Sequence, residues 1–210
     1  MRFAFDSLSA PERYQLMVST IVPRPIAWVV TKDAKGVTNA APYSLFNMFS
    51  DDPPILAIGN GPSPRTGTRK DTARNILETR RFTVCLVPES AAEQMNVTAT
   101  DLPPEVDELA LAGLTEVPFG DGAPRIGESP VAFDCELFQA IELGRHLLVL
   151  GRVVAMEIRD DCVLDAERKH VDTPRLGLIG RTGGGGYVRL TDRLEIPRLT
   201  PEQALARARC

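Results

Sequence analysis

Short runs of β-branched and aromatic residues, separated by turns containing proline and glycine, recur along this chain. The first run spans residues 26–31 and follows Pro23-Arg24-Pro25, where each proline disfavours helix in the residue before it. Residues 32–36 form a turn that ends in glycine, and a second run returns from Val37. The pattern therefore predicts a β-hairpin in the first quarter of the chain.

The same kind of pattern predicts further strands. They cover residues 55–58, 82–87, 131–143, 147–158 and 187–190. The two long ones flank Gly144-Arg145, and the last one follows four consecutive glycines. Helices are expected where capping residues precede helical periodicity. Those segments are residues 10–18 after Ser9, 71–80 with Asp71 as the cap, 90–113 with a break at Pro103-Pro104, and a polar tail at 200–210.

Strands follow one another as neighbours, with helices inserted, and do not alternate regularly with helices. This order favours a mainly β fold, a barrel with helical decorations, over a doubly wound parallel sheet. No internal repeat or long low-complexity linker interrupts the 210 residues. We therefore expect one domain over residues 1–210.

Composition excludes several classes of function. The chain carries 24 Lys and Arg against 28 Asp and Glu, with no basic stripe, so nucleic acid is not an expected partner. No apolar stretch reaches 18 residues, and the N-terminus lacks signal-peptide features, which predicts a cytoplasmic protein without a membrane span. The four cysteines form no CxxC, and with two histidines they predict reduced thiols and no metal site.

No nucleophile elbow, HExxH or Walker phosphate loop is present. The four-glycine run at 183–186 precedes an expected strand and not a helix, so it is not a dinucleotide-binding fingerprint. A bound cofactor would then supply the reactivity, and the protein would orient and tune it.

Two clusters fit a cofactor site. Residues 39–44, Asn-Ala-Ala-Pro-Tyr-Ser, combine small side chains that admit a flat ring with polar groups for its edges. Residues 69–72, Arg-Lys-Asp-Thr, place two cations and a hydroxyl at a helix start, which favours a phosphate. From composition alone, an ordinary turn and an ordinary capped helix remain open as alternatives.

The order of these motifs resembles a known family. The matching segments are 23–31, Gly36, 39–47, Pro53-Pro54, 70–72 with Asn75, 143–146 leading into 150–153, and Arg181 with the glycine loop and Tyr187. They closely resemble the flavin reductase-like FMN-binding family, which includes flavoredoxin and the reductase partners of two-component monooxygenases. The resemblance covers roughly residues 10–198.

This resemblance implies a split β-barrel homodimer with FMN near the subunit interface. Residues 28–31 would run beside the isoalloxazine ring and give backbone groups to its pyrimidine edge. Asn39 and residues 41–44 would bracket the ring and ribityl chain. The phosphate would be held by Ser44, Arg69, Lys70 and Thr72. The complete set implied to bind the cofactor is Trp28, Val29, Val30, Thr31, Asn39, Ala41, Pro42, Tyr43, Ser44, Arg69, Lys70, Thr72, Asn75, His146, Arg181 and Tyr187.

Some single residues have a structural interpretation beside the functional one. Trp28 suits a core or interface position better than ring stacking. His146 is either structural or placed beside flavin or nicotinamide, and Tyr187 either packs or contacts flavin across the dimer. Cys85, where family members often carry asparagine, is expected to be a small buried hydrophobe. Residues 88–128 match no family motif and are expected to cover or shape the substrate side.

The leading hypothesis is NAD(P)H-dependent flavin reduction that supplies reduced FMN or electrons to a partner monooxygenase or redox protein. The alternative is a flavoredoxin-like carrier that binds FMN tightly, is reduced by a protein and has no nicotinamide site. A relative that has lost flavin and serves as an interaction module is disfavoured by the two intact clusters.

Overall fold

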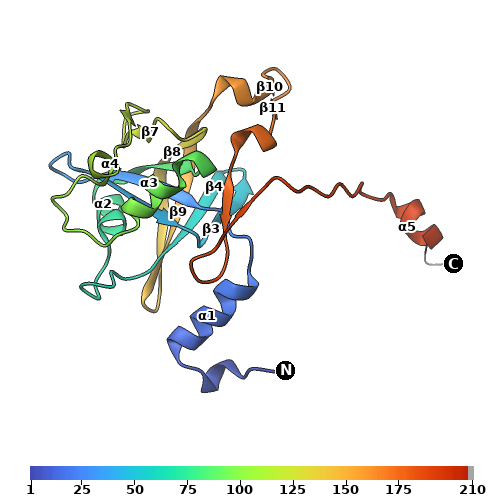
Figure 1. Ribbon diagram of the computed structural model, residues 1–210, viewed down its shortest axis with the longest axis horizontal. Coiled ribbons are helices and arrows are strands. Elements are labelled where there is room, and N and C mark those ends of the chain that lie inside the picture. Colours follow the sequence, from blue (N-terminus) through green and yellow to red (C-terminus); the bar gives the residue numbers. More distant parts are fainter. Residues whose placement is uncertain (208–210) are drawn as a thin grey trace.

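The computed structural model describes residues 1–207, and an antiparallel seven-stranded sheet forms its centre (Figure 1). The strand order is β2-β1-β5-β8-β9-β4-β3. The strands are β1 (Ala27–Lys32), β2 (Thr38–Tyr43), β3 (Phe46–Asp51), β4 (Pro54–Asn60), β5 (Arg81–Leu86), β8 (Val131–Leu143) and β9 (His146–Ile158). The mainly β prediction is confirmed.

Helices and three small hairpins decorate this sheet. The helices are α1 (Ala10–Thr20), α2 (Asp71–Thr79), α3 (Ala92–Thr98), α4 (Glu108–Leu111) and α5 (Pro201–Arg207), with 3₁₀ turns at Phe5–Ser7, Glu89–Ala91, Asp160–Cys162 and Pro174–Leu176. The hairpins pair β6 (Glu116–Val117) with β7 (Arg125–Ile126), β10 (Val163–Asp165) with β11 (His170–Val171), and β12 (Ile179–Arg181) with β13 (Tyr187–Arg189).

Several predicted elements need correction. In the segment 90–113, helices do lie on both sides of the predicted break at Pro103-Pro104, but they are shorter than expected: only α3 and the single turn of α4 are helical, and the side chain of Ser90 caps neither. Pro103 and Pro104 exclude helix from the segment between α3 and α4. Strand β3 was not predicted, because its outward residues are apolar and hide the alternation. Lys70, and not Asp71, is the N-cap of α2.

Other boundaries agree with the sequence. The capping box of Ser9 and Glu12 opens α1, which extends two residues past the predicted end. Strand β8 has its predicted bounds, and β9 begins one residue early at His146. Helix α5 covers part of the predicted 200–210 tail, and residues 208–210 lie outside the described residues.

Strand β1 is buried on both faces because it lies between β2 and β5 and under two apolar clusters. Trp28 and Val30 join the cluster beneath α3 and α4, and Val29 joins the cluster inside the sheet. The indole Nε1 of Trp28 donates to Thr98 Oγ1 at 2.9 Å, which satisfies its polar atom. Trp28 is therefore a core residue.

Burial raises the pKa of Cys85 to about 12, so this thiol is an inert core group, as expected.

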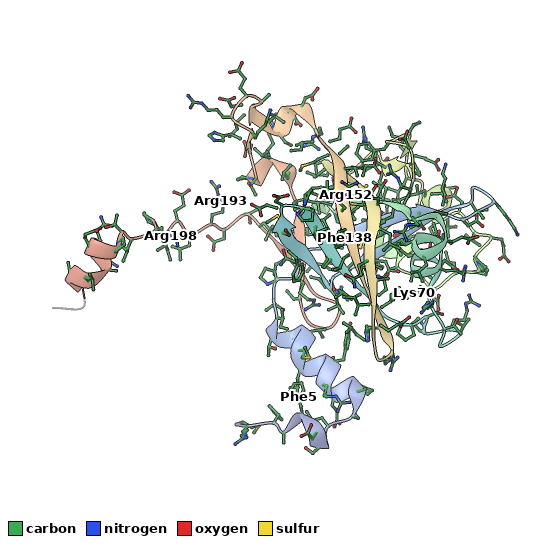
Figure 2. All side chains as sticks on the ribbon, turned by 180° about the vertical axis from the view of Figure 1, so that it is seen from behind. Phe5, Lys70, Phe138, Arg152, Arg193 and Arg198 are labelled. Atoms are coloured by element: carbon green, nitrogen blue, oxygen red, sulfur yellow. The ribbon has the colours of Figure 1, made fainter. Side chains whose placement is uncertain are left out.

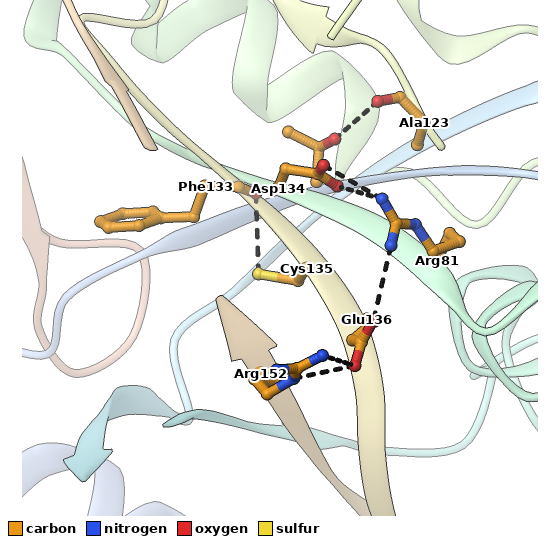
Figure 3. Close-up of polar contacts among 8 residues, drawn as sticks. Arg81, Ala123, Phe133, Asp134, Cys135, Glu136 and Arg152 are labelled. Carbon is orange, nitrogen blue, oxygen red and sulfur yellow. Dashed lines mark hydrogen bonds and ion pairs between the residues drawn. The ribbon is translucent and has the colours of Figure 1, made fainter. Parts of the chain in front are cut away.

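A row of charges crosses β5, β8 and β9 (Figure 3). Arg81 contacts Asp134 at 3.1 Å and Oε2 of Glu136 at 3.6 Å. Arg152 pairs with the other carboxylate oxygen of Glu136, Oε1. Gly120 packs directly over the buried carboxylate of Asp134, where an added Cβ would clash with Oδ2. Thr83 Oγ1 on β5 donates to the carbonyl of Ala123 at 2.7 Å and holds the segment before β7 onto the sheet.

The two ends of the chain project from this body. Helix α1 stands beside the sheet and buries only Val18, and residues 190–200 extend away from it toward α5 (Figure 1). Figure 2 shows Phe5 on the first projection and Arg193 and Arg198 on the second. Both segments carry exposed apolar side chains.

The buried guanidinium of Arg24 joins α1 to the sheet. Its Nη1 donates to the carbonyls of Val18 and Ile21, its Nη2 donates to the carbonyl of Thr182 at 3.0 Å, and its Nε donates to Ser44 Oγ at 3.3 Å. Within the described residues no carboxylate forms an ion pair with it. One side chain therefore satisfies acceptors from three segments.

Replacing Arg24 should destabilise the fold through those carbonyls. We expect Arg24→Met to lower the free energy of unfolding by at least about 2 kcal/mol, because buried acceptors lose charged donors. Arg152→Met is the matched control: Arg152 is half exposed and paired with Glu136, so its loss should cost less than ~1 kcal/mol. Urea unfolding of both variants measures the difference, and equal losses would contradict this role.

Candidate functional site

The two predicted clusters meet where α2 begins beside β2. Thr72 Oγ1 donates to Asn39 Oδ1 at 3.3 Å, and Asn75 Nδ2 donates to Thr31 Oγ1 at 3.1 Å. All four side chains are buried. These bonds fix the start of α2 on the edge of the sheet. The four residues therefore position the site, and their buried side chains expose little surface to a ligand.

Tyr43 and Lys70 lie at the open side of this junction. The Tyr43 hydroxyl is buried and has no hydrogen-bond partner within residues 1–207. Burial raises the pKa of this phenol, which therefore stays protonated and keeps a donor to offer. The ammonium of Lys70 lies 5.8 Å from the centre of the Tyr43 ring, at the start of a nine-residue helix. Free amides, a cation and an unused donor thus come together.

Beside this junction a cleft of about 490 Å³ opens between α1, the end of β2 and the β8–β9 turn. Pro42, Tyr43, Ser44, Lys70 and His146 line it, and Arg145 adds a second cation. A neighbouring cleft of about 610 Å³ lies between α1 and the outer face of β4 and β9. Its walls are mostly apolar, from Tyr14, Met17, Leu45, Phe46, Phe49 and Leu148.

The two clefts together are called the groove. The residues that line both are Ala10, Tyr14, Ser44, Leu45, Gly59 and His146. One end of the groove carries Lys70 and Arg145, and the other end is apolar. Volumes of this size and a few convergent polar groups among apolar walls are typical of cofactor sites. An added Cβ at Gly61 would lie 3.3 Å from His146 Nε2, so this glycine lets the imidazole lie close to the backbone.

Other predicted site residues lie outside the groove. Trp28, Val29 and Val30 have their backbones paired with β2 and β5, and their side chains are in the core. Thr31 and Asn75 are also buried away from it. Residues 28–31 therefore offer no exposed side chain, and the predicted contact of their backbone groups with a flavin ring stays a prediction.

Arg69 differs from Lys70. It is exposed and pairs with Glu142 near the end of β8, in a hollow that adjoins the groove at Arg145 and His146. A carboxylate thus neutralises the first of the two predicted cations. This leaves Lys70 as the one without an ion pair among the described residues.

Arg181 and Tyr187 form a separate cluster. The guanidinium of Arg181 lies 4.5 Å from the centre of the Tyr187 ring on the β12–β13 hairpin. The backbone of Arg181 pairs with that of Arg24, whose side chain lines the groove. The two predicted residues are thus brought together, but they reach the groove only through Arg24.

The sequence interpretation missed Tyr14, Arg24, Arg145 and Glu108. Arg24 and Arg145 stood within recognised motifs but without an assigned role, and Tyr14 belongs to an amphipathic helix whose function no local signal indicates. Glu108 comes from the unmatched region 88–128. That region covers the edge of β2, where Thr98, Asp101 and Glu108 line a small polar cavity with Asn39 and Thr72.

Two further findings concern residues 1–207 alone. No cluster of three or more His, Cys, Asp or Glu side chains there is arranged to hold a metal ion. No helix among them has the length and apolar character needed to cross a bilayer.

Comparison with known proteins shows the family and the fold of this chain. The model of the flavin reductase-like domain family matches residues 18–173. Component B of nitrilotriacetate monooxygenase from Bacillus cereus is 31% identical, with a TM-score of 0.87 over 93% of this chain and 98% of that one. The 2-nitrobenzoate 2-nitroreductase of Pseudomonas fluorescens is 32% identical, with a TM-score of 0.86 over 96% and 98%.

A structure from Shewanella frigidimarina with a split barrel domain gives a TM-score of 0.80 at 22% identity, covering 95% of this chain and all of that one. The predicted split-barrel fold is therefore confirmed. The family match covers well over half of the chain. This protein belongs to the flavin reductase-like family.

Proposed function

We propose that this chain is an FMN-binding oxidoreductase that uses NAD(P)H to reduce flavin and supplies reduced flavin or electrons to a partner. The observation that carries the proposal is the groove, which has cations at one end and an apolar cleft at the other. FMN has the matching shape of a phosphate joined through a polar chain to a flat ring.

The residues present fit this cofactor. Lys70, the free amides of α2 and the partnerless hydroxyl of Tyr43 suit a phosphate or ribityl oxygen. Ser44 and Pro42 lie between this end and the apolar walls. Leu45 and Phe46 offer the apolar surface against which a ring loses water.

FMN, when bound, supplies the hydride- and electron-accepting chemistry. The chain itself then has to bind and orient the flavin and to exclude water from it. This agrees with the absence of an acid–base pair among the described groove residues. Lys70 and Arg145 favour negative charge at one end. His146 belongs to both clefts, and the imidazole lies where it can donate or accept a hydrogen bond.

The second candidate is a flavoredoxin-like carrier, reduced by a protein and not by NAD(P)H. The lack of a glycine-rich nucleotide fingerprint favours it, since the 183–186 run lies in the β12–β13 hairpin and precedes no helix. Both candidates use the same FMN site and differ only in the electron donor.

We also propose a single domain over residues 1–210, a homodimer and a cytoplasmic setting. Exposed apolar side chains on α1 (Tyr14, Met17), on β3 (Phe49) and on the outer face of β8 and β9 (Phe138, Met156) support a second copy as the partner. Figure 2 shows Phe138 and Arg152 on that sheet face.

Buried free thiols at Cys85, Cys135 and Cys162 support a reducing compartment. The neighbour described as component B supports a monooxygenase partner.

Flavin spectra separate the two candidates. We expect the purified protein with FMN, kept anaerobic, to lose its visible flavin band rapidly when NADH or NADPH is added. The more effective nucleotide identifies the donor. A bound flavin that bleaches only with dithionite would favour the carrier, and no flavin binding would overturn the proposal itself.

The phosphate assignment is tested by comparing FMN with riboflavin, which lacks the phosphate. Lys70→Ala should weaken FMN binding by at least about tenfold, equal to ~1.4 kcal/mol, and leave riboflavin binding nearly unchanged. Adding Thr72→Ala should weaken FMN binding further, because Thr72 fixes Asn39 beside the helix start.

Arg69→Ala is the matched control, since Arg69 is already paired with Glu142 and should change the dissociation constant less than about threefold. Fluorescence titration measures all four proteins. Unchanged FMN affinity in Lys70→Ala would refute the assignment.

A further inference from the structure

Glu108 is a buried carboxyl with no described cationic partner. It is 5% exposed, begins α4 and lies against the edge of β2. Its Oε2 accepts the backbone N–H of Ala40 at 3.3 Å. No Lys, Arg or His of residues 1–207 forms an ion pair with it. An ionised carboxyl in this position lacks the pairing that buried charges normally require.

Glu108 shares a small polar cavity with groups of the proposed phosphate end. Asn39, Tyr43 and Thr72 line the same cavity, and the Tyr43 hydroxyl there has no partner. From α3 comes the uncharged Thr98. The carboxyl therefore lies next to residues that hold β2 and α2 together, and not on an isolated surface.

The charged groups around this cavity are mostly acidic. Asp71 and Lys70 face it from the start of α2, and Asp101 faces it from the loop after α3. Asp107 precedes Glu108 and caps α4 through the N–H of Ala110. Asp71 pairs with Arg74, and Asp101 accepts from Ser63 and from the N–H of Arg65. Lys70 is the one cation among the described residues that line this cavity, and it also lines the groove.

Burial raises the pKa of Glu108 to about 7, and the negative charge of Asp71 acts in the same direction. The N–H of Ala40 and the side chain of Asn39 oppose this shift. The carboxyl therefore changes its charge within the neutral pH range.

We propose that Glu108 is a proton-linked positioning residue of the flavin site, which favours flavin phosphate binding when it is neutral and opposes it when ionised. The inference rests on the proposed function, since it assigns the phosphate to this end of the groove. An ionised Glu108 repels a phosphate held at Lys70 and competes for that cation, and it draws water into the junction of β2 and α2. Linkage is reciprocal, so FMN binding causes Glu108 to take up a proton.

The first test is the pH dependence of FMN affinity in the full-length protein. Between pH 6 and 8.5 the wild-type dissociation constant should rise at least about threefold more than that of Glu108→Gln, which stays neutral. Glu105→Gln removes an exposed charge from the same loop and should follow the wild type. FMN's own phosphate ionisation affects all three proteins alike and cancels in the comparison. Parallel profiles for wild type and Glu108→Gln would overturn the inference.

The second test needs no flavin. A carboxyl whose folded pKa exceeds its unfolded value stabilises the fold below the unfolded pKa and loses that contribution as pH rises through the folded pKa. Urea unfolding of the apoprotein should therefore show wild type losing stability relative to Glu108→Gln between about pH 4.5 and 7, then running parallel. Identical profiles across this range would also overturn the inference.

The two tests separate the claims. Failure to bind FMN at any pH, with the apoprotein stability difference present, would refute the proposed function and the flavin role of Glu108. FMN binding with parallel affinity profiles would refute the Glu108 inference alone.

Should Glu108→Gln not fold, the infrared carboxyl band of the wild type provides the measurement. A protonated band present at pH 6 and lost above pH 8 is expected, and its absence at pH 6 would refute the inference.

Discussion

The pairing of β8 with β9 is the constraint on which the rest of the structure depends. Strand β8 pairs on its other side with β5, and β9 pairs with β4, so this hairpin joins the two halves of the sheet. Gly144 has a φ of +59° and allows the tight turn between the strands. The same turn carries Arg145 and His146 to the groove. One hairpin thus completes the core and delivers two residues of the candidate site.

The recognisable motif at 23–31 acts mainly through the fold. Burial of β1 on both faces demands an unbroken apolar run, and Trp28 needs Thr98 as a partner for its indole. Arg24, the charged member of the motif, satisfies carbonyls of α1 and of the glycine loop and reaches Ser44 in the groove. The side chains of the motif in β1 therefore support the site from the core, and Arg24 lines the groove.

The candidate site combines opposite electrostatic preferences within a short distance. Lys70 and the amides of α2 favour an anion, whereas Asp71, Asp101 and Glu108 surround the adjoining cavity with carboxyls. When Glu108 is neutral, the cavity loses the negative charge that nearby groups compensate least. The acidic cavity is then compatible with the preference of Lys70 and the α2 amides for an anion. The protonated Tyr43 hydroxyl adds a donor without adding charge. In the proposed function, anion binding at this junction would depend on whether the buried Glu108 is neutral.

Local signals in the sequence predicted the strands of the central sheet except β3, the capped N-terminal helix, and Lys70 as a phosphate ligand candidate, and the resemblance implied the cofactor class. These depend on contacts between near neighbours, such as the Ser9–Glu12 capping box or the alternation along β1. Tertiary structure decided the rest. It buried Trp28, Thr31 and Asn75 away from the groove, neutralised Arg69 with Glu142, and separated Tyr187 from Lys70. It also brought Glu108 against Ala40, because ion pairing and burial depend on residues distant in the chain, which no local pattern specifies.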